Sequence, residues 1–219
     1  MAETLIKSKA RVQHHGEVFT PNWMVKKMLS EPSIQAKLKD LHATFLEPSA
    51  GEGAFLVEIL NQKLDYVDQV SHKSDWQINA LWALMSIYGI ELLPDNILVA
   101  HERMLQKIVA KYENKIGKKL STRTDFYKTA NFVIKTNVVQ GNALTYKNND
   151  NKLIRFSNWQ PIDKKQVKRD TFTYKSMFDG SQDEVEDGEQ LSLFSLDPEP
   201  ESVDYAICPV TKVYKEIKE

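Results

Sequence analysis

The residues most suited to chemistry lie in one short stretch, Glu47-Pro48-Ser49-Ala50-Gly51-Glu52-Gly53. Here an acidic residue ends an apolar stretch, and a Gly-x-Gly turn leads into a helical pattern. Because glycine has no Cβ, such a turn lets backbone N–H groups approach a ligand, and the following helix points its positive end at a negative group. The Gly-Lys-Ser/Thr of a Walker loop and the longer Gly-x-Gly-x-x-Gly of dinucleotide folds are absent. The pattern favours a ligand site; the alternative is a strand-to-helix turn that binds nothing.

Two more polar residues follow predicted strands. Glu91 comes at the end of an apolar stretch, where a carboxylate in an open α/β sheet can accept hydrogen bonds from both ribose hydroxyls. Asn142 follows another strand pattern, and its amide either contacts an adenine edge or caps a turn. We therefore expect Glu47, Gly51, Gly53 and Glu91 to border one pocket at the carboxyl edge of a sheet.

Alternating strands and helices must position these residues. Strands are predicted over residues 43–47, 88–92 and 137–140, and helices over 21–30, 33–41, 54–64, 76–87, 94–112 and 123–134. This alternation implies parallel pairing, so the predicted fold class is α/β with an N-terminal helical segment. In the longest helix we expect an inward face of Ile97, Leu98, His101, Leu105, Ile108 and Val109.

The pattern changes after residue 146. Two alternating stretches, 153–159 and 167–174, predict a peripheral hairpin, and residues 203–207 predict a fourth strand. The hairpin aromatics lie among basic residues and suit either base stacking with phosphate contact or packing onto the body; they are Phe156, Trp159, Phe172 and Tyr174. The expected organisation is a helical segment (1–42), an α/β core (43–146), the hairpin (147–178), an acidic mobile segment (179–202), and the fourth strand with a tail (203–219).

Composition excludes several classes of protein. The 219 residues are 42% hydrophobic, contain no membrane-length apolar stretch and have a single cysteine, Cys208, so a membrane protein and a disulfide framework are not expected. Residues 1–11 do not resemble a secretory signal, which predicts a cytoplasmic protein. His14-His15 has no third ligand at a plausible spacing, so we predict no metal site and interpret the pair as basic surface residues.

Charge is distributed unevenly along the chain. The net charge is −1, yet residues 1–178 carry 26 basic and 18 acidic residues, a net charge of +8. Residues 179–204 carry ten acidic residues and no basic ones. A basic body predicts a nucleic-acid partner, whose surface the acidic segment mimics or masks; the alternative is that the lysine-rich helices are simply well solvated.

Taken together, these segments resemble the S-adenosylmethionine-dependent DNA adenine-N6 methyltransferases of type I and type IIG restriction-modification systems. The stretch from His15 to Pro21 resembles the family's Phe-Thr-Pro motif, which closes over the methionine end of the cofactor. The resemblance implies a Rossmann-like fold with an incomplete sheet. It also implies a cofactor site formed by Phe19, Thr20, Pro21, Glu47, Pro48, Ser49, Ala50, Gly51, Gly53, Phe55, Glu91, Leu92 and Asn142.

Individual roles follow from the same resemblance. Glu47 corresponds to the acid that holds the methionine amine, and Glu91 to the ribose-binding acid. Ile90 and Leu92 resemble the apolar neighbours of the adenine ring. Asn142 lies where the family has an Asp or Asn near the adenine amino group.

The chain departs from the family at its catalytic tetrapeptide. Members carry Asn/Asp-Pro-Pro-Tyr/Phe after the fourth strand, which accepts hydrogen bonds from the target amine and stacks on a flipped adenine. Here residues 203–207 continue as Cys208-Pro209-Val210, and the family's later strands and recognition domain do not follow. We therefore expect a truncated, degenerate or split member with no intact catalytic residue, although Asn142 could contact the target adenine.

The sequence thus predicts a cofactor-binding domain of a DNA adenine methylation system, inactive as this isolated chain. Its expected partners are DNA and a specificity or second methylase subunit, with no membrane. One alternative is a non-catalytic subunit or remnant that binds cofactor or DNA. Another is a methyltransferase that acts on RNA or protein.

Overall fold

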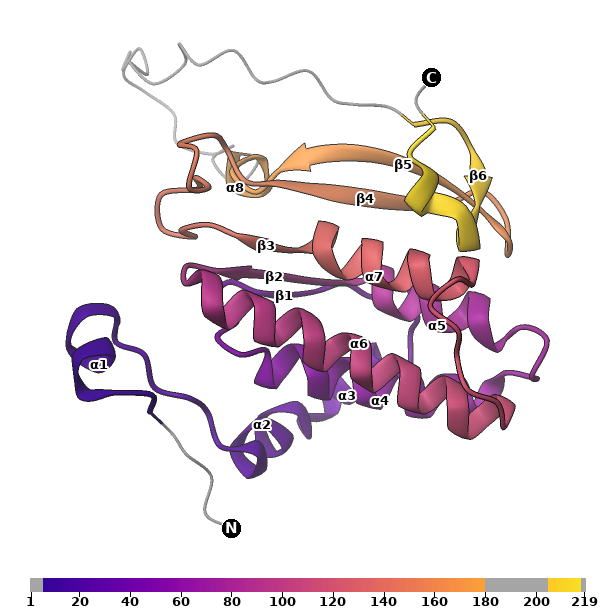
Figure 1. The fold of residues 1–219 in the computed structure, drawn as a ribbon, viewed down its shortest axis with the longest axis horizontal. Helices are drawn as coiled ribbons and strands as arrows, with labels where there is room; N and C mark the ends of the chain where they lie inside the picture. The colour runs from indigo at the N-terminus through magenta and orange to yellow at the C-terminus, as the bar shows by residue number, and fades with distance from the viewer. Residues whose placement is uncertain (1–5, 180–204, 218–219) are drawn as a thin grey trace.

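Three short parallel strands form the middle layer of the structure (Figure 1). The computed structural model describes residues 6–179 and 205–217. The strands are β1 (Phe45–Glu47), β2 (Ile87–Glu91) and β3 (Val138–Gln140), and they lie in the order β1-β2-β3. The fold is therefore mixed α/β with a parallel sheet, as the sequence predicted.

Helices cover one face of this sheet. Helix α4 (Ala54–Val70) follows β1, and α6 (Pro94–Ile116) follows β2 and packs beside α4. Helices α5 (Trp76–Met85) and α7 (Asp125–Asn137) lead directly into β2 and β3. From residue 6 onward, the helices that precede β1 are α1 (Lys9–His15), α2 (Asn22–Leu29) and α3 (Pro32–Leu38).

Local sequence explains where the long helices begin and end. Thr124 caps α7 because its hydroxyl oxygen accepts a hydrogen bond from the Tyr127 N–H. Pro94 is the first residue of α6, where a missing N–H costs nothing, and the helix ends at Gly117 with φ +79°.

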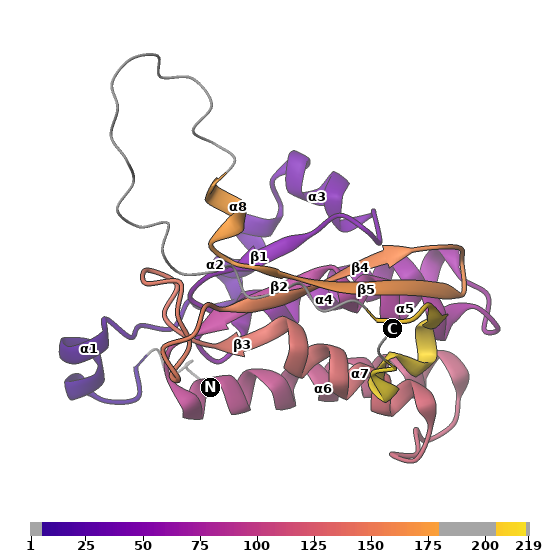
Figure 2. The same cartoon turned by 90° about the horizontal axis from the view of Figure 1, so that it is seen from above.

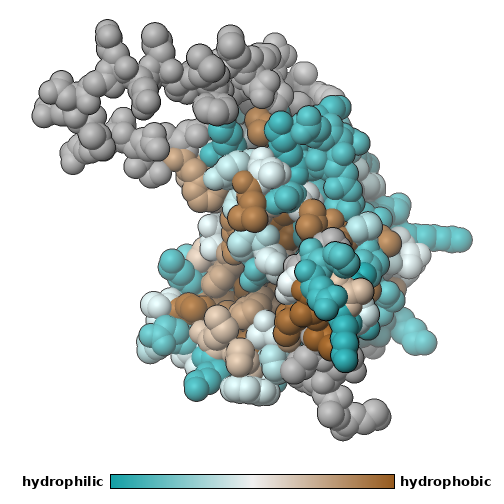
Figure 3. All heavy atoms as spheres, turned by 90° about the vertical axis from the view of Figure 1, so that its left-hand side faces the viewer, coloured by the Kyte–Doolittle hydropathy of each residue, from teal (hydrophilic) through white to brown (hydrophobic). Residues whose placement is uncertain are grey.

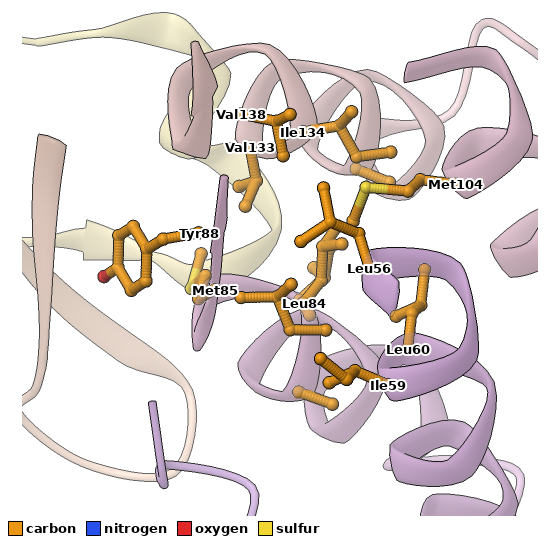
Figure 4. Packing of buried hydrophobic residues seen from close by; sticks show 14 of the residues in the cluster. Leu56, Ile59, Leu60, Leu84, Met85, Tyr88, Met104, Val133, Ile134 and Val138 are labelled. Carbon is orange, nitrogen blue, oxygen red and sulfur yellow. The ribbon is translucent and has the colours of Figure 1, made fainter. Parts of the chain in front are cut away.

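The core lies between these helices and the sheet (Figure 4). Side chains from α4, α5, α6 and α7 point toward one another there, and a fully buried leucine contributes about 1.5–3 kcal/mol relative to an exposed one. Helix α5 is buried on nearly every side, in agreement with its apolar sequence. The expected inward face of α6 is partly wrong. Leu98 is 67% exposed, and the small Ala100 and the flexible Met104 occupy the buried face.

An antiparallel hairpin covers the other face of the parallel sheet (Figure 2). It consists of β4 (Arg155–Pro161) and β5 (Gln166–Thr173), close to the predicted stretches, and is followed by the short α8 (Ser176–Asp179). Tyr88 points away from the helical core toward the hairpin, where its hydroxyl donates to the Ser157 carbonyl at 2.8 Å.

The hairpin aromatics pack onto the body. Phe156, Trp159 and Tyr174 are buried, and Phe172 packs against the core. Stacking on nucleic-acid bases, the other use that the sequence left open, is therefore not available to these rings. Among them only Tyr174 and Trp159 carry polar atoms, and the Trp159 indole N–H already donates to Asn137.

The predicted fourth strand is not part of the parallel sheet. Of residues 203–207, those in the described part form a single bridge at Tyr205, and the strand that follows is β6 (Cys208–Pro209). It pairs antiparallel with β5 and continues into a 3₁₀ helix, η1 (Val210–Lys215), which packs against α7 and α5. This segment joins the second sheet because β5 of the hairpin offers it backbone hydrogen-bonding partners. The acidic segment lies outside the described residues.

Among the described residues, no helix combines the length and apolarity that a membrane crossing requires.

Candidate functional site

Two adjoining cavities open at the carboxyl end of the parallel sheet, beside α1. The first has a volume of about 540 Å³ and lies between residues 18–22, the loop after β1, the start of α4, and Arg103 of α6. The second, of about 430 Å³, lies between residues 16–19, the ends of β2 and β3, and residues 141–144. Both are bordered by Val18, Phe19, Ser49 and Gly51. Figure 3 shows this end of the molecule, with apolar side chains grouped among hydrophilic ones.

A hydrogen bond between Gly51 and Glu91 joins the loop after β1 to the end of β2. The Gly51 N–H donates to Glu91 Oε2 at 2.6 Å, while Oε1 accepts from the Leu93 N–H at 2.9 Å. Gly51 has φ +53°, a conformation that favours glycine, and the Phe19 ring lies against it. An ionised carboxylate has about four acceptor positions, and Gly51, Leu93 and Asn96 occupy three of them, so Glu91 keeps one for a ligand hydroxyl group, on Oε2.

Glu47 lies at the wall of the first cavity. Its Oε1 accepts a hydrogen bond from the Ser49 N–H at 3.0 Å. Burial nevertheless raises the pKa of the Glu47 carboxyl above its ordinary value, since desolvation outweighs that single hydrogen bond. A carboxylate in this state is stabilised by a cation.

Gly53 and Pro21 lie outside the linings of both cavities, contrary to expectation. Gly53 caps α4 with φ +79°, and a Cβ added there would come within 3.0 Å of the Ala100 Cβ. Its role is to let α4 approach α6 closely. Pro21 precedes α2 as its N-cap residue and orients that helix, while its neighbour Thr20 borders the first cavity.

Glu47 and Glu91 were expected to border one pocket, but Glu47 borders the first cavity and Glu91 the second, and the remaining predicted residues divide between the two. Ala50 and Phe55 border the first, and Pro48, Leu92 and Asn142 border the second. Ile90 is fully buried and cannot contact a ligand.

Asn142 adopts one of the two arrangements that the sequence left open. Its Oδ1 accepts from the Leu144 N–H at 2.9 Å, so the side chain caps a turn while it borders the second cavity. This turn presents Leu144, which is 91% exposed.

A charged network holds the N-terminal segment against α6. Arg11 donates two hydrogen bonds to Glu17 and also pairs with Asp95, and Lys7 pairs with Asp95 at 2.9 Å. Hydrogen bonds from Arg11 and Lys7 lower the pKa of Asp95 to about 2. Asn96 is buried and donates to both Glu17 Oε1 and Glu91 Oε1, at 2.5 and 3.3 Å. The network thus connects the segment that carries Phe19 to the carboxylate that holds Gly51.

The sequence analysis missed Arg103, Asn22 and Asn96. Arg103 borders the first cavity, and its Nη1 donates to the Glu52 carbonyl at 2.9 Å. Helical spacing could have found it, because Arg103 lies one turn after Ala100, the residue that faces Gly53.

Residues 208–210, which follow the predicted fourth strand, lie far from both cavities. Cys208, Pro209 and Val210 are at the end of the molecule opposite α1, near the hairpin turn, where the Val210 N–H donates to the Lys165 carbonyl (Figure 1). Burial raises the pKa of the Cys208 thiol, so it is a poor nucleophile there. Within the described ranges, no three His, Cys, Asp or Glu side chains are placed to hold a metal ion.

The chain has no match among protein-family models, curated proteins or solved structures. Function must therefore be argued from the site itself.

Proposed function

We propose that the two cavities together bind S-adenosylmethionine and that the chain serves as a cofactor-binding domain in a DNA adenine-N6 methylation system. The observation that carries the proposal is the hydrogen bond from Gly51 to Glu91. It brings a glycine turn at a helix start and a ribose-suited carboxylate to one sheet edge. The fold is then best interpreted as a partial Rossmann-like methyltransferase fold.

The chemistry of the two cavities supports a ligand with two different ends. The second cavity combines Glu91, which can accept hydroxyl hydrogen bonds, with the apolar Leu92 and the polar Asn142, a combination suited to adenosine. The first contains Glu47, whose carboxylate suits an ammonium group. Each cavity is within the roughly 300–1,000 Å³ typical of small-molecule sites.

Methyl transfer by this chain alone is not part of the proposal. Transfer to an amine requires acceptors that hold the amine in line with the sulfonium. Cys208 and Val210 are at the other end of the molecule, and the Asn142 amide oxygen is engaged by Leu144. The non-catalytic reading, in which a partner subunit supplies the acceptors, therefore fits this geometry better than independent catalysis.

Calorimetry with S-adenosylmethionine and, separately, with ATP tests cofactor binding. We expect saturable binding of S-adenosylmethionine and none of ATP, because the loop after β1 has no lysine for a triphosphate. Preference for ATP would replace the proposal with a nucleotide-binding function.

Tritiated-methyl transfer to mixed-sequence DNA tests catalysis. We expect incorporation at background with the purified chain. Incorporation that vanishes in Glu47→Ala would contradict this expectation and place the missing acceptor within the chain.

DNA as a partner rests on the excess of basic residues in 1–178. Binding to duplex DNA should weaken steeply as salt concentration rises, because phosphate contacts release counterions. Affinity independent of salt would reject an electrostatic DNA surface. Equal binding to duplex RNA would favour the RNA methylation alternative.

A further inference from the structure

Two charged side chains in the first cavity have no partner of opposite charge within the described part of the chain. The cavity is bordered by Glu47, Glu52 and Arg103. Glu52 pairs with Lys7 at 2.8 Å. Among the described residues, neither Glu47 nor Arg103 takes part in an ion pair.

The surroundings of Glu47 favour a positive ligand group. The carboxylate is partly buried, receives one backbone hydrogen bond and has a pKa raised by desolvation. An ammonium group placed beside it would offset that desolvation and lower the pKa again.

The surroundings of Arg103 favour a negative one. A guanidinium has five N–H donors, and the bond from Nη1 to the Glu52 carbonyl uses one of them. That bond ties the side chain to the loop after β1, and the contact of Ala100 with Gly53 fixes the same turn of α6 relative to that loop. The guanidinium of Arg103 is thus held in position, and its planar set of N–H groups can bind a carboxylate through two parallel hydrogen bonds.

The resemblance assigns the ligand's ammonium group to Glu47, and we infer that Arg103 binds its carboxylate, so that the first cavity recognises an α-amino acid as a zwitterion. The inference rests on the proposed cofactor function and assigns Arg103 as a specificity-determining residue. A ligand that carries both charges on one carbon satisfies both side chains together. A ligand with only one of them leaves the other side chain without a partner.

Calorimetry with three related ligands tests the assignment. S-adenosylmethionine carries both charges, decarboxylated S-adenosylmethionine lacks the carboxylate, and 5′-methylthioadenosine lacks the whole amino acid. We expect the wild-type chain to bind S-adenosylmethionine at least about tenfold more tightly than its decarboxylated form.

Arg103→Gln should abolish that preference. Its affinity for S-adenosylmethionine should fall about tenfold, while its affinity for the other two ligands stays within about twofold. Arg103→Lys should restore part of the preference, because it keeps the charge but not the fork. Arg123→Gln, an exposed change in the loop before α7, is the matched control and should change none of the affinities.

The outcomes separate this inference from the proposed function. If all three ligands bind the wild type equally, or if Arg103→Gln weakens all three alike, the zwitterion assignment is wrong while the adenosine site stands. If 5′-methylthioadenosine and S-adenosylmethionine both fail to bind, the proposed function and the inference fall together. Equal binding of the three ligands by the wild type would reject the assignment whether or not Arg103→Gln folds.

Discussion

A charged side chain lies at each end of β1, fully buried at one end and partly buried at the other, and the two differ in how many hydrogen bonds they make. At the start of β1, the ammonium of Lys63 from α4 donates to the carbonyls of Asp40 and Ala43 and to the Ser86 hydroxyl, at 2.7–2.8 Å. After β1, the carboxylate of Glu47 receives one backbone hydrogen bond.

The difference separates a structural charge from a binding charge. Lys63 is fully buried, and its three nearest acceptors match the three N–H bonds of an ammonium group. It therefore fixes the loop before β1 and has nothing left to offer a ligand. Glu47 keeps acceptor capacity toward a cavity, which is the arrangement expected of a site that awaits a partner.

Removing Lys63 should have the largest effect. Lys63→Met leaves the buried Ser86 hydroxyl and the partly buried carbonyls of Asp40 and Ala43 without this donor, so the free energy of unfolding should fall by roughly 3 kcal/mol, as measured by urea denaturation. Lys73→Met, an exposed lysine in the loop after α4, is the control and should change stability by less than about 0.5 kcal/mol.

Stability against pH sharpens this prediction. Burial lowers the pKa of Lys63 to about 8 from an ordinary 10.5, so the unfolded chain binds more protons between these values. The free energy of unfolding of the wild type should therefore increase as the pH rises through this range. Lys63→Met should lack this increase. Equal pH profiles for the two proteins would show that Lys63 keeps its proton as readily as a solvated lysine.

Removing Glu91 should have the next largest effect, on ligand affinity. Glu91→Ala loses acceptors for the ribose hydroxyls and the bond that holds Gly51, so calorimetry should show a loss of about 1.5–3 kcal/mol in binding S-adenosylmethionine. Glu91→Gln keeps one acceptor oxygen and should lose less. Unchanged affinity in Glu91→Ala would remove Glu91 from the site.

Glu47→Gln should move stability and binding in opposite directions. Because burial raises the pKa of Glu47, its protonated form suits the fold, and any stability that it contributes at low pH is lost as the pH rises through its raised value. The neutral glutamine should thus melt at a higher temperature than wild type at pH 7.

The same change should weaken S-adenosylmethionine binding about tenfold, since the ammonium loses its counter-charge. Wild-type affinity should also fall on acidification, as Glu47 takes up a proton, whereas the Glu47→Gln affinity should not. A variant that is less stable and binds equally well would place Glu47 with Lys63 as a structural charge.

The ion pairs of the N-terminal segment should have the smallest effect. Arg11→Gln removes the bonds to Glu17 and Asp95, so Phe19 is held less firmly over Gly51 and ligand affinity should fall slightly. The Arg11 and Asp95 side chains are 27% and 48% exposed, so salt screens their pair and the wild type should approach the variant's affinity as salt concentration rises. A constant difference between them at all salt concentrations would mean that Arg11 acts by packing.

Much of the α/β core was predictable from local pattern. The helices α4, α5, α6 and α7, the three parallel strands and the β4–β5 hairpin all carry periodic apolar residues and short turn signals. Glu91 next to Gly51 was also predictable, since carboxyl ends of parallel strands share one edge.

Contacts between elements far apart in the sequence were not predictable from local pattern. Whether residues 205–209 join the parallel sheet or the hairpin depends on which edge offers partners, and β5 offers them. Gly53 looked like a ligand-facing glycine because its contact with Ala100 joins residues 47 positions apart. Arg103 was missed for the same reason, as its place in the cavity follows from how α6 packs on that glycine.

The parallel sheet and the hairpin also differ in how they must assemble. Each parallel pair is separated by a long helical connection, from Glu47 to Ile87 and from Glu91 to Val138, whereas β4 and β5 are joined by a short turn. Non-local pairing requires closure of a large loop before any contact compensates its entropy, so it is slow, while a hairpin forms within about 1–10 μs. The isolated hairpin is only marginally stable, however, until the ring of Tyr88 arrives beneath it. The parallel pairing that brings both cavities to one sheet edge is thus expected to form later in folding than the first contacts of the hairpin.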